Sequence, residues 1–432
     1  MSVADLDQQT TERAADRRRL HAVGTEARRR TLPARVAYAL AAVVIGLGLL
    51  ASITPSPLYH TYSILWGFSP LTLTLIYATY AFGVLATLLL AGRVSDDVGR
   101  RPVLLVALGT LMASSVLFMF ADSVAWLFVA RGLQGLATGA ALSAASAALL
   151  DLHPRRDPAS VGLTNSVAAS TGTGLGVLVS SSLVQLGSAP RVLPYVVLLA
   201  LFAIAFAGAY WMPEPVEERR RFRLTAERPT VPPVARRAFL LAGLAVLSSW
   251  SIGGLFFSLG PQLSAHLFNS TNAITSGIGI VALAGSGSVA ALLLSRTAPW
   301  IGASAGSVAL AAGMLLIVAA AATDSSTTYL AGSVLGGIGF GAAFLGGLRG
   351  LVAVIPNEHR AAVMSSFYIV AYASLSVPAV LAGIVVTHLG LQTTFETFGT
   401  AVSAVALIVA FEAWRTRPVA REPHLQSGRF AP

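Results

Sequence analysis

Long apolar runs separated by short polar connections make up most of the chain. Each run holds about 20 residues, the length that a helix needs to cross the hydrocarbon core of a bilayer. We expect spans at 36–58, 69–91, 103–121, 124–150, 160–187, 192–212, 239–267, 272–294, 301–322, 328–355, 361–388 and 391–414. The pattern therefore predicts an all-α integral membrane protein with twelve transmembrane helices.

A polar segment rich in Pro, Glu and Arg divides these spans into six and six. Such a composition does not remain in hydrocarbon, so we predict a cytoplasmic linker there. The expected domains are a cytoplasmic disordered tail at 1–35, an N-terminal six-helix bundle at 36–212, the linker at 213–238, a C-terminal six-helix bundle at 239–414 and a cytoplasmic tail at 415–432.

An internal repeat supports this division. The sequence Gly135-x-x-x-Gly139-Ala-Ala recurs 202 residues later as Gly337-x-x-x-Gly341-Ala-Ala, and a proline that follows each copy recurs at the same offset. Glycine and alanine are abundant in this chain, so a single match could arise by chance. Two matches at one offset favour a duplicated six-helix unit.

The charge distribution indicates which side of the membrane each loop faces. Only 11% of the residues are charged, against roughly 25% in soluble domains, and the formal net charge is +10. Outside the spans, Arg191 is the only basic residue in a loop that would face outward, so the positive-inside rule places both termini in the cytoplasm. Anionic lipid headgroups, rather than nucleic acid, are the expected partner of this charge. The chain has no cysteine, which excludes disulfides, thiolate nucleophiles and Cys-ligated metals.

A dense polar island connects spans two and three. Its distinctive residues are Gly92, Asp96, Gly99, Arg100 and Arg101. Their order resembles the loop signature between helices two and three of the major facilitator superfamily, with Asp97 where that pattern has Arg or Lys. The resemblance implies the fold of that superfamily, in which two six-helix halves enclose a substrate site near the bilayer midplane.

In that superfamily the loop works as a cytoplasmic latch, so the resemblance implies a gating role for these residues. Asp151, at the inner end of span four, resembles the acidic partner of the latch arginine. The alternative is an ordinary charged loop that follows the positive-inside bias. The corresponding segment of the second half, 295–300, lacks the pattern, so any latch is asymmetric.

Span four carries a second motif, Arg131-x-x-Gln134-Gly135-x-x-x-Gly139, which resembles another signature of the superfamily. Arg131 lies about 10 Å along its helix, where an arginine costs at least about 2.5 kcal/mol unless it faces a partner or a wet cavity. Because Gln134 shares its helix face and the glycines form a small packing face, we expect Arg131 to line a cavity or to organise hydrogen bonds. Snorkelling to the membrane surface is the alternative.

Two weaker motifs point to one branch of the superfamily. The end of span one, 47–57, is similar to the Leu-Gly…Pro-x-x-Pro motif of the twelve-helix drug efflux branch, with Thr54 at its first Pro. Span five keeps the small residues of the antiporter motif but has Val177 in place of its Pro. These small residues favour close helix packing.

The candidate substrate cavity consists of polar and aromatic residues within the spans. They are Tyr77, Tyr80, Asn165, Trp250, Gln262, Tyr368 and Tyr372. Packing or interfacial anchoring is the alternative role of each aromatic residue. No Asp or Glu lies at the middle of a span, and Glu396 is near the outer end of span twelve. Proton-coupled antiporters commonly keep such a carboxylate because burial raises its pKa.

Together these observations predict a multi-pass secondary transporter of the bacterial inner membrane that works by alternating access. Efflux of lipophilic drugs or metabolites is the leading function, and sugar or metabolite transport is the alternative. A non-transporting membrane sensor is the alternative from another class. We expect no enzymatic activity, since no Ser–His or Asp–Asp pair lies within the spans at matched depth. We also expect a monomer without metal or cofactor, for which a proton gradient is one available energy source.

Overall fold

The computed structural model describes residues 31–90, 94–216, 230–356 and 359–417, and this part of the chain is helical without a strand. Its α-helices are α2 (Ala34–Ile53), α3 (Tyr59–Trp66), α4 (Pro70–Leu90), α5 (Val94–Val98), α6 (Arg100–Met119), α7 (Val124–Leu152), α8 (Pro158–Leu186), α9 (Leu193–Tyr210), α10 (Arg236–Ser258), α11 (Gly260–Leu267), α12 (Ala273–Leu294), α13 (Pro299–Thr323), α14 (Ser326–Val352) and α15 (Arg360–Arg415). Gly92 and most of both predicted tails lie outside the described residues.

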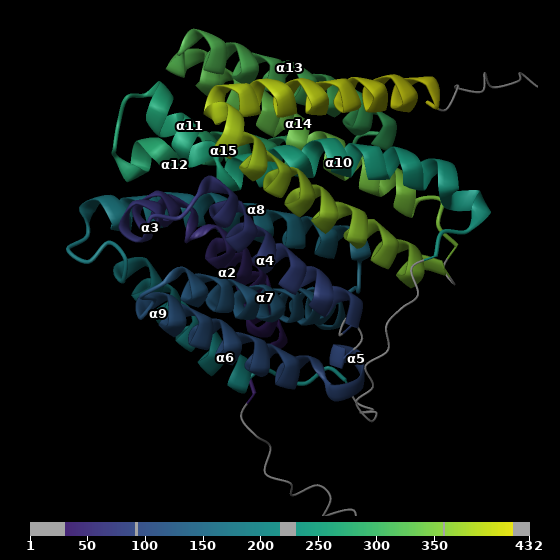
Figure 1. Cartoon of the computed structure of the whole chain (residues 1–432). Coiled ribbons are helices and arrows are strands. Elements are labelled where there is room, and N and C mark those ends of the chain that lie inside the picture. Colours follow the sequence, from purple (N-terminus) through teal and green to yellow (C-terminus); the bar gives the residue numbers. More distant parts are fainter. Residues whose placement is uncertain (1–30, 91–93, 217–229, 357–358, 418–432) are drawn as a thin grey trace, which may run out of the picture.

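Within the described residues, eleven helical segments are long and apolar enough to cross a membrane. The sequence predicts twelve because it separates 361–388 from 391–414, whereas the structure joins both in α15. A straight helix of this length would extend about 84 Å, far beyond a hydrocarbon core of about 30 Å. Gly390 interrupts α15 with φ 83° and ψ 172°, a conformation that glycine adopts without a steric penalty. Figure 1 shows α15 as two arms that meet at an angle.

Two predicted spans are broken in the structure. Span one, predicted at 36–58, is α2 followed by a 3-10 turn at Ser56–Leu58, and α3 comes after it. Span seven divides into α10 and α11 next to Pro261. Proline has no N–H and cannot donate the i→i−4 hydrogen bond, so each break lies where a proline removes one. Apolar residues resume after each proline, which is why the sequence pattern predicts continuous spans.

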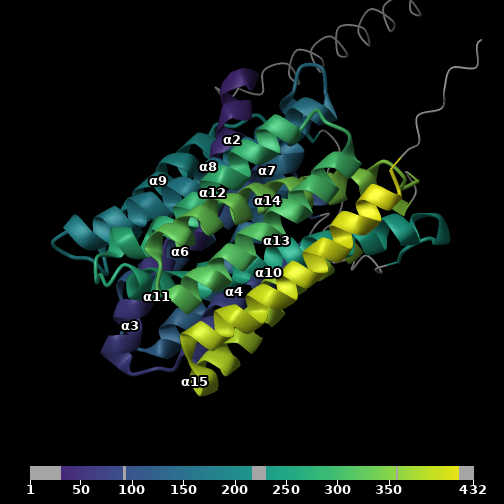
Figure 2. The same cartoon turned by 90° about the horizontal axis from the view of Figure 1, so that it is seen from above.

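Helices from residues 34–210 gather on one side of the molecule and helices from residues 236–415 on the other (Figure 1). The main contacts between the two groups run along α4 with α15 and along α8 with α12, and Figure 2 shows α15 passing beside α4. Both pairs pack closely. A Cβ at Gly277 of α12 would lie 2.6 Å from the Ser181 hydroxyl of α8, and one at Gly383 of α15 would overlap Thr74 of α4.

The internal repeat is visible in the helix packing. Helix α7 begins at Val124 and α14 begins 202 residues later (326 − 124). A Cβ at Gly135 would overlap the backbone of α4, and one at Gly341 would overlap the backbone of α12. The glycines of each copy thus allow two helix backbones to approach closely, in α7–α4 and in α14–α12.

Candidate functional site

Five of the seven predicted cavity residues lie together between the two groups of helices. Tyr77 and Tyr80 come from α4, Trp250 from α10, and Tyr368 and Tyr372 from α15, and all belong to one apolar cluster. The two α4 tyrosines are almost fully buried, and the Trp250 ring meets the Tyr372 ring edge-on at a centroid distance of 5.3 Å. We call these five residues the aromatic cluster. In the aromatic cluster, large side chains from both halves of the chain pack against one another.

The other two predicted cavity residues lie elsewhere. Asn165 of α8 accepts a hydrogen bond of 3.3 Å from the Ser146 hydroxyl of α7, so it connects two helices of the first half. Gln262 lies in α11, beyond the break of span seven, and is half-buried. The length of the apolar run predicts one helix here, and only Pro261 in the sequence indicates the break.

The break between α2 and α3 is held by side chains from two other helices. Pro55 lacks the N–H that would bond to Ala51, and the Ala51 carbonyl instead accepts from Gln134 Nε2 of α7 at 3.0 Å. The Ser52 carbonyl accepts from Arg131 Nη1 at 2.8 Å, and the Thr54 carbonyl accepts from the Ser180 hydroxyl of α8 at 2.6 Å. Backbone groups exposed by the break are thereby satisfied inside the protein.

Arg131 is the centre of this network and is completely buried. Its Nε donates to the Tyr59 hydroxyl at 2.6 Å, and its Nη1 also donates to Gln134 Oε1 at 2.7 Å. Complete burial excludes snorkelling to the membrane surface.

The Arg131 guanidinium also lies against three tyrosine rings. Its carbon is 5.5 Å from the ring centre of Tyr59, 5.9 Å from that of Tyr77 and 5.2 Å from that of Tyr80. These distances allow cation–π attraction. Two of the rings belong to the aromatic cluster, so the hydrogen-bond network of α7 adjoins the contact between the halves. Within the described residues no carboxylate pairs with Arg131, and its Nη2 has no hydrogen-bond partner.

The predicted latch residues meet at the start of α6. Arg100 Nε donates to Asp151 Oδ2 at the end of α7 at 3.0 Å, and Arg100 Nη1 donates to the Ser95 hydroxyl at 2.8 Å and pairs with Asp96. Arg101 lies over the Tyr210 ring of α9 at 5.2 Å. The sequence treats this region as a loop, but Val94–Val98 forms α5 and α6 already begins at Arg100.

Glu214, which follows α9, completes this contact and is missed by the sequence analysis. Its carboxylate oxygens accept the backbone N–H groups of Arg100 at 2.9 Å and of Arg101 at 3.1 Å. These are the first N–H groups of α6, which have no partner within the helix. Gly99, with φ 110°, brings the chain into this position. The one available signal is that Glu214 is the first charged residue after span six.

The second half uses different chemistry at the corresponding connection. Arg349 of α14 donates from Nη1 to the carbonyls of Thr297 at 2.9 Å and Leu294 at 3.4 Å. These carbonyls lie at and beyond the C-terminal end of α12, where a cation is favourable. No ion pair is formed there among the described residues.

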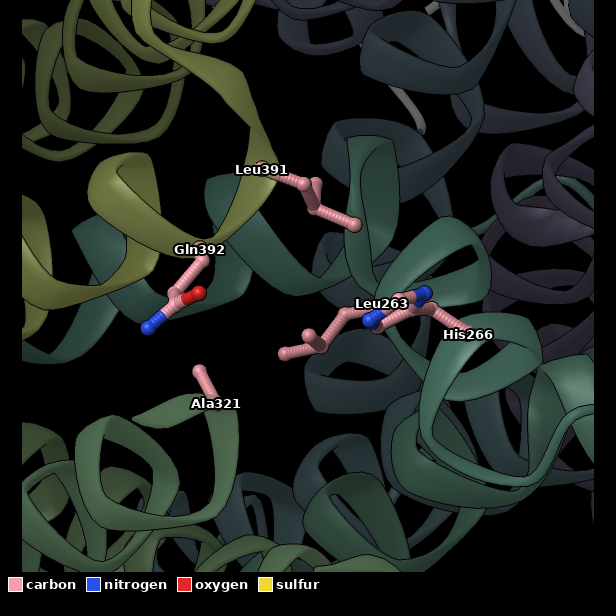
Figure 3. A pocket seen from close by; sticks show the side chains of 5 residues that line it. All are labelled: Leu263, His266, Ala321, Leu391 and Gln392. Carbon is pink, nitrogen blue, oxygen red and sulfur yellow. The ribbon is translucent and has the colours of Figure 1, made fainter. Parts of the chain in front are cut away.

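A separate hollow of about 250 Å³ lies within the second half (Figure 3). It is lined by Leu263 and His266 of α11, Ala321 of α13, and Leu391 and Gln392 just after the bend in α15. The exposed His266 side chain lies 3.3 Å from Asp324. None of the predicted site residues lines this hollow, and only one half of the chain contributes to it.

A sequence model described as Major Facilitator Superfamily matches residues 35–323, which is more than half of the chain. The chain belongs to the Major Facilitator Superfamily. Members of this superfamily are transporters and not enzymes. The all-helical structure agrees with this membership, and the chain is similar to the human organic anion transporter MFSD10 (TETRAN), with a TM-score of 0.63 over 88% of this chain and 100% of that one at 19% identity.

Two relatives are similar over shorter segments of this superfamily chain. It is 33% identical to Multidrug resistance protein D of Escherichia coli over 144 residues, which are 31% of this chain and 34% of that protein. It is 34% identical to a triacylglyceride transporter of Mycolicibacterium smegmatis over 113 residues, 26% of this chain and 20% of that protein. The alignments thus span about a third and a fifth of these relatives.

Proposed function

We propose that the protein is a secondary active transporter of the bacterial inner membrane that exports lipophilic drugs or metabolites by alternating access. The observation that carries this proposal is the aromatic cluster, to which α4 of the first half and α10 and α15 of the second half contribute. When the halves move relative to each other, the contacts of a site that both halves build are made and broken. Its rings suit an apolar, flat compound.

The proposed architecture has twelve spans in two six-helix bundles, with α15 counted as two spans that meet at Gly390. With both termini in the cytoplasm, the N-terminal ends of α4 and α12 and the C-terminal end of α8 face outward. The Ala273 N–H at the start of α12 donates to Gln185 Oε1 near the end of α8 at 2.9 Å. In this topology the halves therefore touch on the outward side. Fusions of a cytoplasmic reporter after Met212 and at the C-terminus should both be active, and an inactive C-terminal fusion would refute twelve spans.

In the proposed cycle the latch controls movement at the cytoplasmic side. Arg100 connects α5 and α6 to the end of α7, and Glu214 connects the start of α6 to the segment after α9. These contacts keep the cytoplasmic ends of the first half together as one rigid unit. A proton gradient is the proposed energy source, with anionic lipid headgroups around the arginine-rich cytoplasmic face.

Transport of N-phenyl-1-naphthylamine, an uncharged fluorescent compound, into inverted membrane vesicles with an imposed proton gradient tests this proposal. We expect gradient-dependent accumulation that Tyr80→Ala and Tyr372→Ala each reduce at least about tenfold. Phe82→Ala is the matched control, because Phe82 lies in the same helix as Tyr80 and its side chain is half exposed on the outside of the protein. Accumulation that is absent, or that is equal in all variants, would refute export through the aromatic cluster.

A further inference from the structure

We propose that the protein prefers compounds that carry an anionic group, and that Arg131 binds this group through Nη2 while the apolar body lies in the aromatic cluster. This inference rests on the proposed transport function and names its substrate class. It begins from a free hydrogen-bond donor. Arg131 is 0% exposed, yet its Nη2 has no hydrogen-bond partner among the described residues.

The donors of Arg131 divide into two sets. Nε and Nη1 hold the structure, since they donate to Tyr59, the Ser52 carbonyl and Gln134. Guanidinium has five N–H groups, and the two on Nη2 remain. Buried polar groups are nearly always hydrogen-bonded, and a free donor on a charged group is especially unfavourable. The structural role of Arg131 is therefore satisfied without Nη2, which leaves Nη2 for a ligand.

A second buried polar group lies on the same helix face. Thr138 is seven residues after Arg131 in α7 and four after Gln134, so the three side chains share one face. Thr138 is completely buried, and its hydroxyl lies beside the phenol of Tyr80 in the aromatic cluster. A carboxylate has two oxygens and accepts up to about four hydrogen bonds. It can therefore use a guanidinium N–H and a hydroxyl at once.

The local charge favours an anion over a cation. Arg131 carries a positive charge that no carboxylate in the described residues neutralises, and it already lies against the rings of Tyr77 and Tyr80. A cationic ligand beyond these rings would be about 8 Å from the guanidinium, and at an effective dielectric constant of 20 the repulsion would weaken binding roughly 30-fold. An anion in the same place would gain from the same field.

A matched series of three ligands tests the inference: 4-(1-pyrenyl)butanoate, its primary amide and 4-(1-pyrenyl)butylamine. They share one apolar ring system and differ in charge at pH 7. Dissociation constants are measured by isothermal titration with the purified full-length protein in detergent. We expect the carboxylate to bind at least about tenfold more tightly than the amide, because it adds a charge-assisted hydrogen bond, and the amine to bind most weakly.

Variants locate the effect. Arg131→Gln should reduce the affinity for the carboxylate to that for the amide, and Arg131→Lys should keep part of the preference, because an ammonium keeps the charge but not the planar fork. Arg349→Gln is the control, since Arg349 is an arginine within a helix of the other half and, among the described residues, its hydrogen bonds go to the carbonyls of Leu294 and Thr297. The ratio of carboxylate to amide affinity in the wild-type protein tests the anion preference without any variant, so the test remains decisive even if Arg131→Gln does not fold.

Several outcomes would overturn the inference: equal affinity for carboxylate and amide, tighter binding of the amine, no binding of any of the three, or an unchanged preference in folded Arg131→Gln. Equal affinities together with gradient-driven transport of the uncharged naphthylamine would leave the transport function standing. A carboxylate preference that depends on Arg131, without any transport, would instead refute the proposed function and keep the anion site.

Discussion

Removing the ion pair between Arg100 and Asp151 should loosen the contact between the start of α6 and the end of α7. The Arg100 Nε to Asp151 Oδ2 distance is 3.0 Å, and the two side chains are 11% and 27% exposed. At an effective dielectric constant of 20 the attraction at this distance is about 5.5 kcal/mol. Loss of hydration offsets most of it, so we expect a coupling free energy of about 1–3 kcal/mol.

A double-mutant cycle measures this coupling. The free energy of unfolding is determined in mixed detergent micelles for the wild type, Arg100→Gln, Asp151→Asn and the double variant. The pair between Arg415 and Glu412 is the internal control, because its side chains are 63% and 35% exposed at a distance of 2.7 Å. Exposed pairs within one helix contribute only about 0.3–0.5 kcal/mol.

The structure also predicts the order of the single substitutions. Asp96 pairs with Arg100 but is 55% exposed, so Asp96→Asn should cost less than about 1 kcal/mol, and Asp151→Asn should cost more. A coupling between Arg100 and Asp151 below about 0.5 kcal/mol, or equal to that of the control pair, would show that the two residues are not energetic partners. The contact between Arg100 and Asp151 would then not hold α6 to α7.

Three further predictions follow from particular contacts. Gly135→Ala should destabilise the protein by about 1–3 kcal/mol because its Cβ would overlap the backbone of α4. Gly285→Ala is the control and should not destabilise it, because the space around its Cβ is open. Thermal unfolding of both variants tests the difference. Glu214→Ala should cost about 1–2 kcal/mol in the same assay by removing the acceptor of the first N–H groups of α6, and Glu214→Gln should cost less. Glu396→Gln should leave gradient-driven transport unchanged, since Glu396 is only half-buried and its Oε1 accepts a hydrogen bond from Gln392 Nε2 of the same helix at 2.9 Å. Uncoupling in proteoliposomes would show that this carboxylate carries the proton.

Local patterns in the sequence predict much of the packing. Apolar runs mark the helices because a segment in hydrocarbon must bury its backbone groups in helical hydrogen bonds. The spacing of Gly135 and Gly139 predicts a close helix contact, since only small residues let two backbones meet, and both glycines face α4. Five of the seven cavity candidates lie in one cluster, because large aromatic side chains within spans must find partners across helices.

Contacts between distant segments could not be predicted in this way. Glu214 lies 114 residues from Arg100, and no local pattern states that a carboxylate after one helix satisfies the first N–H groups of another. Pro55 and Pro57 indicate an interruption after α2, but no local pattern states which side chains satisfy the carbonyls that it frees. The break leaves the carbonyls of Ala51 and Ser52 without helical donors. Gln134 donates to the first and Arg131 to the second, which explains why the two side chains occur together.

The repeat reproduces helix packing but not the polar network. At the offset that relates Gly135 to Gly337, Arg131 corresponds to Ser333 and Gln134 to Gly336, and the Ser333 hydroxyl donates within its own helix to the Tyr329 carbonyl. The second half therefore has small residues at the positions where the first half has Arg131 and Gln134. In the proposed site a substrate would place its polar end toward α7 and its apolar body toward α10 and α15. Movement of the halves would then separate the apolar body of the substrate from α10 and α15, while Arg131 still bound the anionic group. The substrate would thus stay with the first half while the second half moved away from it and back.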